Sequence, residues 1–468
     1  MIRVSAVSVA VAACLGLSAC AVGPDYVRPD TPAPAVYKEL GDWQPAKPQD
    51  AALDSKWWEI YNDPKLNELE QKLMDSNQSL KAALASYAES RALLDSAKAG
   101  FWPTLSANGG LTRSQRGTAE PANNYTLGGS ASWEADVWGR VRRSVESSKA
   151  SAEASAFDLA DTRLSLQATL ATDYFELRAQ DALQDLLDAT VAADQQSLTI
   201  AQNRYNSGVA AKADVVTAQT QLLSVQAQQL NAGILRAQLE HAIAVLTGES
   251  PAEFALAKTT FASAVPGVPV GVPSTLLQRR PDVAAAERSA ASASAQIGVA
   301  VAAWFPSLTL GASGSFSNNT LSNLLTIPNR VWSIGPSLAA TLFDGGARNA
   351  RIRQAHAAYD LSVAQYRQSV LTAFQQVEDD LANLRILEKQ AALDTELVRS
   401  AHEAETLTLN QYRAGTVPFS SVISAQTTTL SSEQTALTVL RSRLVGSVAL
   451  ISSLGGGVDP EHPEAATK

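Results

Sequence analysis

The chain has 468 residues, enough for two or three ordinary domains or for one long duplicated domain. Apolar residues make up 46% of the chain and charged residues 18%, a composition that excludes a globally disordered protein. The net charge of −9 and the lack of any basic stripe argue against nucleic-acid binding, because phosphate contacts need clustered Lys and Arg.

The residue types that carry catalysis and metal binding are sparse. Only Cys14 and Cys20 occur, both near the N-terminus, so neither a disulfide framework nor a cysteine metal site is available. No Ser/His/Asp order, nucleotide loop or ligand-spaced histidine cluster stands out. The sequence therefore predicts no catalytic residue, no metal and no enzyme. The four histidines are far apart in sequence, at His241, His356, His402 and His462.

The first residues look like a targeting signal. Arg3 precedes a short apolar stretch, Val4 to Leu17, which is too short to span a bilayer as a mature helix. The stretch ends in Leu17-Ser18-Ala19-Cys20, which resembles a bacterial lipobox. That resemblance implies a signal peptide over residues 1–19 and N-acyl and S-diacylglycerol groups on Cys20. Residues 20–64 would then form an acylated N-terminal segment, whose acyl chains anchor by burying methylenes in lipid. The alternative is an ordinary signal peptide with incidental cysteines.

The chain contains an internal duplication. The turn around Arg204 to Val209 recurs 207 residues later as Gln411 to Thr416, and Phe101-Trp102-Pro103 recurs 203 residues later as Trp304-Phe305-Pro306. Copies of this length are far beyond solenoid repeats. A stretch rich in Pro, Gly and Val separates them and is typical of an extended linker. The predicted organisation is a first repeat, a linker, a second repeat and a tail, at residues 65–249, 250–274, 275–456 and 457–468.

Each repeat predicts an unusually long helix and a shorter return helix. No proline or glycine interrupts residues 140–205, and a seven-residue period, the pattern of a coiled-coil seam, runs through this segment. About 66 helical residues span roughly 100 Å. Return helices are expected over residues 214–246 and 420–454. A free-standing antiparallel coiled coil is the alternative. The seam positions are Leu170, Leu177, Gln184, Val191, Leu198 and Tyr205, with Val377, Leu384, Ala391, Val398, Glu405 and Tyr412 as their copies.

Each repeat also predicts a β-hairpin, at about residues 104–138 and 307–343. Apolar and polar residues alternate there with period two, and each candidate strand has about 10 residues, the length of a tilted transmembrane strand. A soluble half-buried sheet would show the same alternation. In a bilayer, open sheet edges are not tolerated, and small barrels need about eight strands. Because one chain supplies four, a barrel would have to be assembled from several copies.

Several motifs carry a family resemblance over nearly the whole mature chain. They are Gly23-Pro24-Asp25-Tyr26, Trp57-Trp58, Trp133 to Arg140, Leu276 to Asp282 and Trp304 to Leu308. In this order the chain resembles a TolC-type outer-membrane factor of the lipoprotein branch, similar to the NodT- and OprM-like proteins that serve RND efflux pumps.

The resemblance implies a mixed α/β membrane protein in the outer membrane. Its expected form is a homotrimer with a 12-stranded transmembrane β-barrel, formed by four strands from each protomer, and a long periplasmic α-barrel. Small molecules would pass through it passively. The implied partners are a periplasmic adaptor protein, an inner-membrane RND transporter and outer-membrane lipid, with no nucleic acid and no cofactor beyond the lipid on Cys20.

The resemblance also implies a gate and an adaptor contact at the two helix turns. Asp214 matches a carboxylate that bonds a tyrosine matching Tyr412, although Asp214 could equally begin the return helix. The glycines of the two turns could also be simple helix C-caps. Serines replace the family's aspartates and Val417 replaces an arginine, so an acidic, cation-binding constriction is not predicted. The implied gate and adaptor-contact residues are Tyr205, Gly208, Asp214, Tyr412, Gly415, Ser421 and Ser424.

Two other functions remain open from the sequence. One is a duct for protein secretion, which would share the architecture of an efflux duct. The other, from a different class, is a lipoprotein scaffold or adhesin built on coiled coils. A scaffold would not need two period-two hairpins at matching places in a duplication.

Overall fold

The computed structural model describes residues 21–31, 34, 36–40, 56–259, 261, 264–268 and 279–457. The predicted signal peptide, the acylation site Cys20 and the tail beyond residue 457 lie outside these residues. Short elements precede the first repeat. They are the 3₁₀ helices η2 (Lys38–Leu40) and η3 (Trp57–Tyr61) and the helix α2 (Pro64–Ser76).

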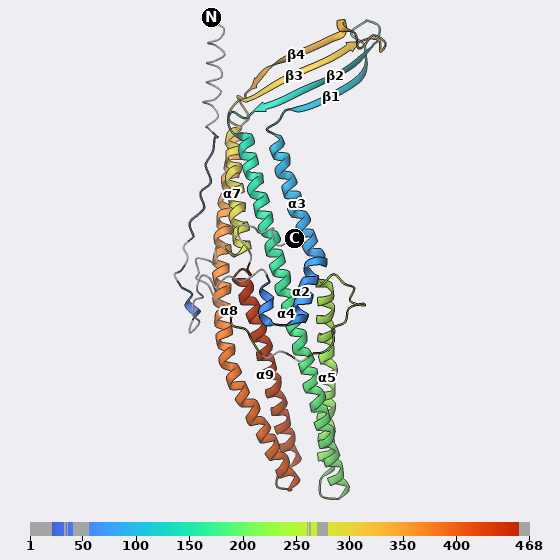
Figure 1. Cartoon of the computed structure of the whole chain (residues 1–468), viewed down its shortest axis with the longest axis vertical. Coiled ribbons are helices and arrows are strands. Elements are labelled where there is room, and N and C mark those ends of the chain that lie inside the picture. The colour runs from blue at the N-terminus through green and yellow to red at the C-terminus, as the bar shows by residue number, and fades with distance from the viewer. Residues whose placement is uncertain are drawn as a thin grey trace. The chain divides into compact units, whose positions relative to one another are not determined.

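The long helices of the two halves have equal lengths in the described chain (Figure 1). The first half contains α3 (Gln78–Ala99), α4 (Arg140–Asn206) and α5 (Lys212–Leu246), with 22, 67 and 35 residues. The second half contains α7 (Pro281–Ala302), α8 (Ala347–Arg413) and α9 (Phe419–Ser453), again with 22, 67 and 35 residues. The repeat seen in the sequence is therefore also a repeat of structure.

The starts of the two 67-residue helices follow from local sequence. Asp136 accepts hydrogen bonds from the backbone N–H groups of Val141 and Arg142, both at 2.9 Å, and so satisfies free donors in the first turn of α4. Asp344 accepts likewise from the N–H of Arg348 at 3.0 Å at the start of α8. The capping aspartate explains part of the motif around Trp133 to Arg140.

The seven-residue seam is buried along much of both long helices. Leu170, Leu177 and Leu198 are buried on α4, and Val377 and Leu384 are buried on α8. This confirms the helices and the apolar period that the sequence predicts. Among the described residues, α9 alone is long and apolar enough to cross a membrane, but its Val422 and Leu430 pack into buried clusters with residues of α4 and α5. The composition of α9 therefore reflects helix packing.

The described strands form one antiparallel sheet in the order β1-β2-β3-β4. The strands are β1 (Thr104–Ser114), β2 (Ala122–Ala135), β3 (Ser307–Asn318) and β4 (Arg330–Ala339), and a short 3₁₀ helix, η4 (Ile327–Asn329), precedes β4. Each predicted hairpin is thus present, and the β2–β3 pairing joins the two halves of the chain.

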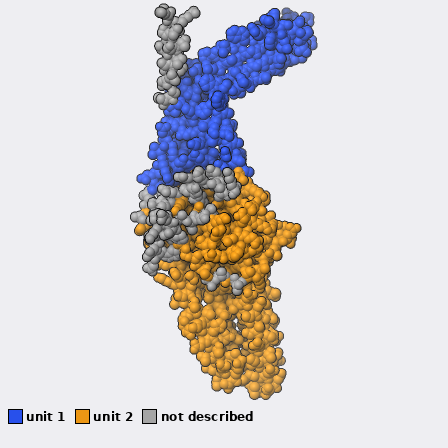
Figure 2. Space-filling view, in the orientation of Figure 1, with its two compact units in different colours: residues 1–31, 85–156, 284–369 blue, residues 32–84, 157–283, 370–468 orange. Residues whose placement is uncertain are grey.

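The chain divides into two compact units, drawn in different colours in Figure 2. Unit 1 comprises residues 1–31, 85–156 and 284–369 and contains the sheet. Unit 2 comprises residues 32–84, 157–283 and 370–468 and contains the turns between α4 and α5 and between α8 and α9. The two candidate regions for function therefore lie in different units.

The segment that follows Cys20 is held along the helices of unit 1. The N–H of Val22 donates to the carbonyl of Trp138 at 3.1 Å, and the buried Arg143 binds the carboxylate of Asp25 at 2.7 Å. The hydroxyl of Tyr26 donates to the carboxylate of Glu287 at 2.6 Å. The motif Gly23-Pro24-Asp25-Tyr26 therefore fixes the start of the described chain on the fold.

In unit 2, equivalent contacts join helix ends in both halves. The side-chain amide of Asn77 donates to the carbonyl of Leu246 at 2.8 Å, next to the start of α3. The guanidinium of Arg280 donates to the carbonyl of Ser453 at 3.1 Å, next to the start of α7. Each shorter helix therefore meets the return helix of its own half at a hydrogen-bonded joint.

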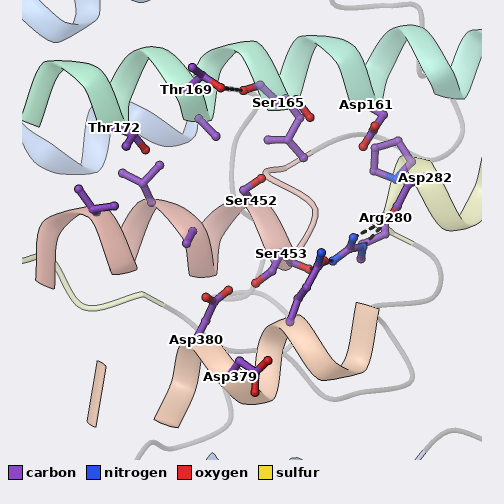
Figure 3. A pocket seen from close by; sticks show the side chains of 17 residues that line it. Asp161, Ser165, Thr169, Thr172, Arg280, Asp282, Asp379, Asp380, Ser452 and Ser453 are labelled. Carbon is purple, nitrogen blue, oxygen red and sulfur yellow. Dashed lines mark hydrogen bonds and ion pairs between the residues drawn. The ribbon is translucent and has the colours of Figure 1, made fainter. Parts of the chain in front are cut away.

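A cavity of about 720 Å³ lies beside the second joint, between α4, α8 and α9 (Figure 3). Arg280 forms an ion pair with Asp282 at 2.6 Å at its edge. Burial raises the pKa of Asp161 and that of Asp380 to about 6, and the charge of Asp282 adds to the effect at Asp161. The cavity is lined by polar side chains, such as Asp380 and Ser453, together with apolar ones, such as Leu164 and Val448.

Candidate functional site

One face of the four-stranded sheet is apolar over most of its length. The register pairs Leu105 with Ala131, Ala131 with Ala312 and Ala312 with Ile334, so these residues share a face. Every second residue along each strand belongs to the same face, and most of the large ones are exposed in the protomer. The large apolar members are Leu105, Leu111, Leu127, Trp133, Leu308, Leu310, Phe316, Trp332, Ile334 and Leu338. Arg113, Tyr125 and Arg330 share this face at the end of the sheet away from the helices.

The opposite face is almost entirely small and polar. The hydroxyls of Ser313 and Ser333 share a hydrogen bond of 2.9 Å across β3 and β4, and the hydroxyl of Ser317 donates to the side chain of Asn124 at 2.9 Å. Such an alternation needs an apolar environment on one side and water on the other. Members of this face include Ser106, Asn108, Thr126, Ser130, Ser132, Glu134, Thr309, Ser315 and Ser337.

Aromatic residues gather where the strands meet the helices. Trp102 precedes β1, Trp133 lies near the end of β2, and Trp304 and Phe305 precede β3, so all four lie at one end of the sheet. The indole N–H of Trp133 donates to the carbonyl of Phe101 at 2.9 Å. Aromatic rings with one polar handle are enriched at membrane–water interfaces. This belt marks the end of the apolar face.

The turns at the far ends of the long helices have the same backbone geometry. Gly208 has φ +75° and Gly415 has φ +78°, the left-handed conformation that favours glycine. The N–H of Val209 donates to the carbonyl of Arg204, and that of Thr416 to Gln411, both at 3.0 Å. These six-to-one bonds are those of a Schellman C-cap, so both glycines cap helices as one of the two interpretations predicted.

The two turns pack together through a buried cluster in unit 2. Leu198, Ala201, Ala218 and Leu222 of the first half contribute to it, and the second half supplies Tyr412, Phe419 and Val422. The tyrosines of the two turns differ in this packing. Tyr412 is 3% exposed, whereas its counterpart Tyr205 is 44% exposed.

The predicted bond between Asp214 and Tyr412 is not formed. The hydroxyl of Tyr412 is buried without a hydrogen-bond partner among the described residues. Asp214 lies in the first turn of α5, where the helix dipole favours a carboxylate. Burial, and then the charge of Asp214, raise the pKa of Tyr412. The prediction of a tether was therefore wrong for this structure, and Asp214 has the position of the alternative, a residue that begins the return helix.

The sequence reasoning missed Arg204 as a site residue. Its guanidinium lies 4.7 Å from the centre of the Tyr412 ring and donates to the carbonyl of Arg413 at 3.1 Å. Tyr412 in turn packs against Phe419, with ring centres 5.1 Å apart. The available signal was the cation directly before Tyr205, where the second half has Gln411.

Ser421 and Ser424 line a groove of about 420 Å³ between α8 and α9. The other lining residues are alanine, serine and threonine, and none is acidic. Among the residues that the structure describes, no group of three or more His, Cys, Asp or Glu could hold a metal ion. The arrangement of small hydroxyls can bind water but offers no charged ligand set.

An amphipathic sheet with a belt of aromatic residues, carried on helices of 67 residues, defines a membrane duct with a long helical extension. Residues 69–249 and 272–456 match the model of the outer membrane efflux protein family. The chain therefore belongs to the outer membrane efflux protein family and is an outer-membrane component of an efflux system.

Relatives match along nearly their whole length. A probable efflux pump outer membrane protein of Pseudomonas putida, TtgC, is 31% identical over 464 residues, covering 97% of this chain and 96% of TtgC. The pyoverdine export outer membrane protein OpmQ of Pseudomonas aeruginosa is 30% identical, with 98% of each chain covered. The solved outer-membrane channel OprN superposes with a TM-score of 0.87 at 30% identity, covering 93% of this chain and 99% of OprN.

Proposed function

We propose that three copies of this chain close one 12-stranded β-barrel, through which small molecules leave the cell passively. The observation that carries the proposal is the sheet with one apolar face, one hydroxyl-rich face and two open edges. In a closed barrel the apolar face meets lipid, and the face of Ser, Thr and Asn lines a water-filled lumen. No chemical step is required of the duct.

The open edges make other copies necessary. Within the described residues, β1 and β4 each pair on one side only. Lipid cannot supply hydrogen bonds to the free side of either strand, so β1 of one copy must pair with β4 of the next. Three copies give 12 strands, the number implied by the resemblance to TolC-type factors.

The helices carry unpartnered apolar surfaces that fit the same ring. On α5, Val216, Leu223 and Leu230 are exposed at seven-residue spacing, and they are named here the α5 stripe. On α8, Ile386, Leu393 and Leu407 are exposed at multiples of seven, and they are named the α8 stripe. A heptad of exposed apolar residues is typical of a seam that awaits a partner helix.

The internal duplication indicates which surfaces meet. The counterpart of Leu223 is Leu430, which is buried in a cluster with α4 and α5 residues. The counterpart of Leu393 is Leu186, which packs against that same cluster. Because α8 is the counterpart of α4 and α5 is the counterpart of α9, the α4–α9 contact inside the protomer is a template for a contact between copies. The α8 stripe of one copy would meet the α5 stripe of the next. Such a head-to-tail contact closes into a ring.

The partners follow from the relatives and the architecture. TtgC and OpmQ are named as outer membrane proteins of an efflux pump and of an export system. We infer that this chain likewise meets a periplasmic adaptor and an inner-membrane RND transporter, which supplies the energy. The adaptor would contact the two helix turns, at Tyr205, Gly208, Tyr412 and Gly415. No observation specifically favours the alternative function, a duct for protein secretion.

Lipidation of Cys20 remains part of the proposal. The segment from Ala21 onward is fixed on unit 1 near Trp138, at the belt end of the sheet, which suits an anchor in the adjacent leaflet. We expect Cys20→Ser to leave the fold intact and to abolish labelling by radioactive palmitate. Persistent labelling would contradict the anchor.

The pore itself is tested with purified protein. Light scattering in detergent should give the mass of a trimer, and planar bilayers containing the protein should conduct potassium chloride in discrete steps. A chain that stays a soluble monomer without detergent, or that never conducts, would overturn the proposed function.

A further inference from the structure

The four strands carry only three charged residues, and two of them lie on the apolar face. Glu134 lies near the aromatic belt, on the hydroxyl-rich face. Arg113 and Arg330 lie at the opposite end of the sheet, on the apolar face, and both side chains are exposed. In the described part of the chain, neither guanidinium has a hydrogen-bond or ion-pair partner. These two cations therefore have no counter-ion within the protomer.

The position of the two arginines along the strands suits a membrane surface. A lipid-facing arginine is strongly unfavourable at the middle of a bilayer and nearly neutral at its surface. The helices of unit 1 lie at the belt end of the sheet (Figure 1). In the proposed duct, with its helices in the periplasm, the end that carries Arg113 and Arg330 would lie in the outer leaflet, at the level of the lipid headgroups.

Arg113 and Arg330 belong to the two edge strands, β1 and β4, which the proposed barrel pairs between copies. Inside the protomer, Leu127 of β2 pairs with Phe316 of β3. The hairpin registers make Ile334 the counterpart of Leu127, and Arg113 the counterpart of Phe316. Ile334 of one copy would therefore lie opposite Arg113 of the next. Arg330 lies four residues from Ile334 on the same face, roughly 13 Å along β4.

This pairing gathers positive charge at the seams between copies only. At the equivalent places inside the protomer, the counterpart of Arg113 is Phe316 and that of Arg330 is Asn123, neither of which is charged. The loop between β1 and β2 adds no net charge, because it carries Arg116 as well as Glu120. Two cations held apart on a lipid-facing surface require an anion with two separate charged groups, and a guanidinium matches a phosphate with paired hydrogen bonds.

We propose that each seam between copies binds a membrane lipid with two phosphates, the headgroup chemistry of lipid A, through Arg330 of one copy and Arg113 of the next. This inference rests on the proposed trimeric duct, because within one protomer β2 and β3 separate the two arginines. Trp332 lies between Arg330 and Ile334 on the same face, where an indole suits the headgroup level. The acyl chains would lie along the apolar face, and a trimer would hold three lipids.

Binding of lipid A to purified trimers tests the site. Delipidated trimers in detergent are titrated with bisphosphoryl lipid A, and native mass spectrometry counts the lipids retained. The wild type should retain up to three. The double variant Arg113→Gln, Arg330→Gln should bind roughly 10- to 100-fold more weakly, because each phosphate loses a charge-assisted contact. The matched control is Arg351→Gln, Arg353→Gln, which removes two exposed charges from α8 in the same unit and should bind like the wild type. Equal binding by the two double variants would overturn the inference.

The wild type with other probes separates the possible sources of phosphate. Monophosphoryl lipid A should bind about 10-fold more weakly than the bisphosphoryl form, since one arginine loses its partner. Dioleoylphosphatidylethanolamine should bind more weakly still, and a large excess of inorganic phosphate should not displace the lipid. Equal binding of both forms of lipid A would show a general lipid contact, and displacement by inorganic phosphate would show a site for free anions. Either result would overturn the inference.

Failure of this site differs from failure of the proposed function. If the wild type does not form trimers or does not conduct, the duct itself is wrong. If it forms conducting trimers that do not prefer bisphosphoryl lipid A, the duct stands and the lipid site is wrong. Light scattering shows whether the arginine variant is still a trimer. If it is not, the comparison of the two forms of lipid A on the wild type still decides the inference.

Discussion

The two helix turns of this protein show how far a duplicated sequence dictates duplicated structure. Both turns end a 67-residue helix, use a glycine with positive φ and close with the same six-to-one hydrogen bond. Yet Tyr412 is 3% exposed and Tyr205 is 44% exposed. Local backbone geometry follows from the local sequence, whereas burial depends on which neighbour is present. The exposed member of each pair marks a surface that another molecule can cover.

The same contrast extends along the helices. Leu430 of α9 is 6% exposed, and its counterpart Leu223 of α5 is 56% exposed. Both are leucines at the same heptad position, so neither residue type nor helix propensity explains their difference in exposure. The contrast teaches that the first half's return helix and the second half's long helix are the outer members of the protomer. In the proposed ring they are the helices that a second copy would cover.

The largest expected effect comes from breaking this second-copy contact. Leu393→Glu places a carboxylate in the α8 stripe, where the proposed interface would bury it without a partner. Such burial costs about 2–5 kcal/mol at each interface, so we expect purified protein to lose the trimer. Light scattering in detergent would measure this. Thr395→Glu adds the same charge on the other side of α8 and should leave a trimer. A trimeric Leu393→Glu protein would contradict the assignment of the stripe.

Much of the fold was predictable because its signals are local or periodic. The segment from Arg140 to Tyr205, which contains no proline or glycine, predicted the end of α4 to within one residue. The period-two alternation of apolar and polar residues predicted each hairpin. The register between β2 and β3 was not predictable, because it joins residues nearly 200 positions apart. The 3₁₀ helix at Trp57–Tyr61 was also missed, since its two tryptophans are explained only by burial in unit 2.

A second prediction concerns a buried carboxyl group of the first half. Glu70 of α2 is fully buried, both of its carboxylate oxygens lack hydrogen-bond partners among the described residues, and burial raises its pKa well above the ordinary value. A raised folded-state pKa means that stability is present below the unfolded pKa and is lost as pH rises. We expect Glu70→Gln to stabilise the protein by roughly 1–3 kcal/mol at pH 8 and by little at pH 4.

Thermal unfolding followed at several pH values measures this difference. Glu68→Gln is the matched control, because Glu68 lies two residues away on α2 and is exposed beside Lys65. Its melting temperature should stay close to that of the wild type at both pH values. A Glu70→Gln protein that is less stable than the wild type at pH 8 would mean that the carboxylate has a partner in the assembled protein.

The third prediction tests the equality of the two caps. Alanine at Gly208 or Gly415 must adopt a left-handed conformation, which costs about 1–2 kcal/mol and predicts a 5- to 30-fold rise in local amide exchange. The amides of Val209 and Thr416 report on the two capping bonds. An added methyl would meet nothing within 4 Å at Gly208 and only the Nη2 atom of Arg204, at 3.9 Å, at Gly415, so the two variants should respond alike. Asparagine tolerates this conformation better and should give a smaller rise. Unequal responses would show that the tips differ in backbone as well as in burial.

The site was less predictable than the fold for a related reason. Gly208 and Gly415 were found because a left-handed turn has a sequence signature. Arg204 was missed, because its role depends on the Tyr412 ring of the other hairpin, 208 residues away in sequence. The family resemblance implied a bond between Asp214 and Tyr412. In the structure, the guanidinium of Arg204 stacks on the Tyr412 ring instead. Contacts between hairpins are decided by tertiary packing, which local sequence patterns do not reveal.

The smallest expected effect compares two aspartates at equivalent positions. Asp173 of α4 and Asp380 of α8 both have a pKa raised to about 6, chiefly by burial. The charge of Glu176 adds to the effect at Asp173, and that of Asp379 at Asp380. Because the folded pKa exceeds the unfolded value of about 3.8, each group favours folding below pH 4 and loses this contribution as pH rises through 6.

Replacing either aspartate with asparagine should therefore raise the melting temperature at pH 8 and leave it unchanged at pH 4. Both side chains are partly exposed, so solvent screening limits the gain to less than about 1 kcal/mol. Asp185→Asn, at an exposed position of α4, is the control and should show no such pH dependence. If Asp380→Asn alone destabilises the protein, then Asp380 has a role at the cavity beside Arg280 that its counterpart lacks. The equivalence of the two halves would then end at the cavity, as it does at the tips.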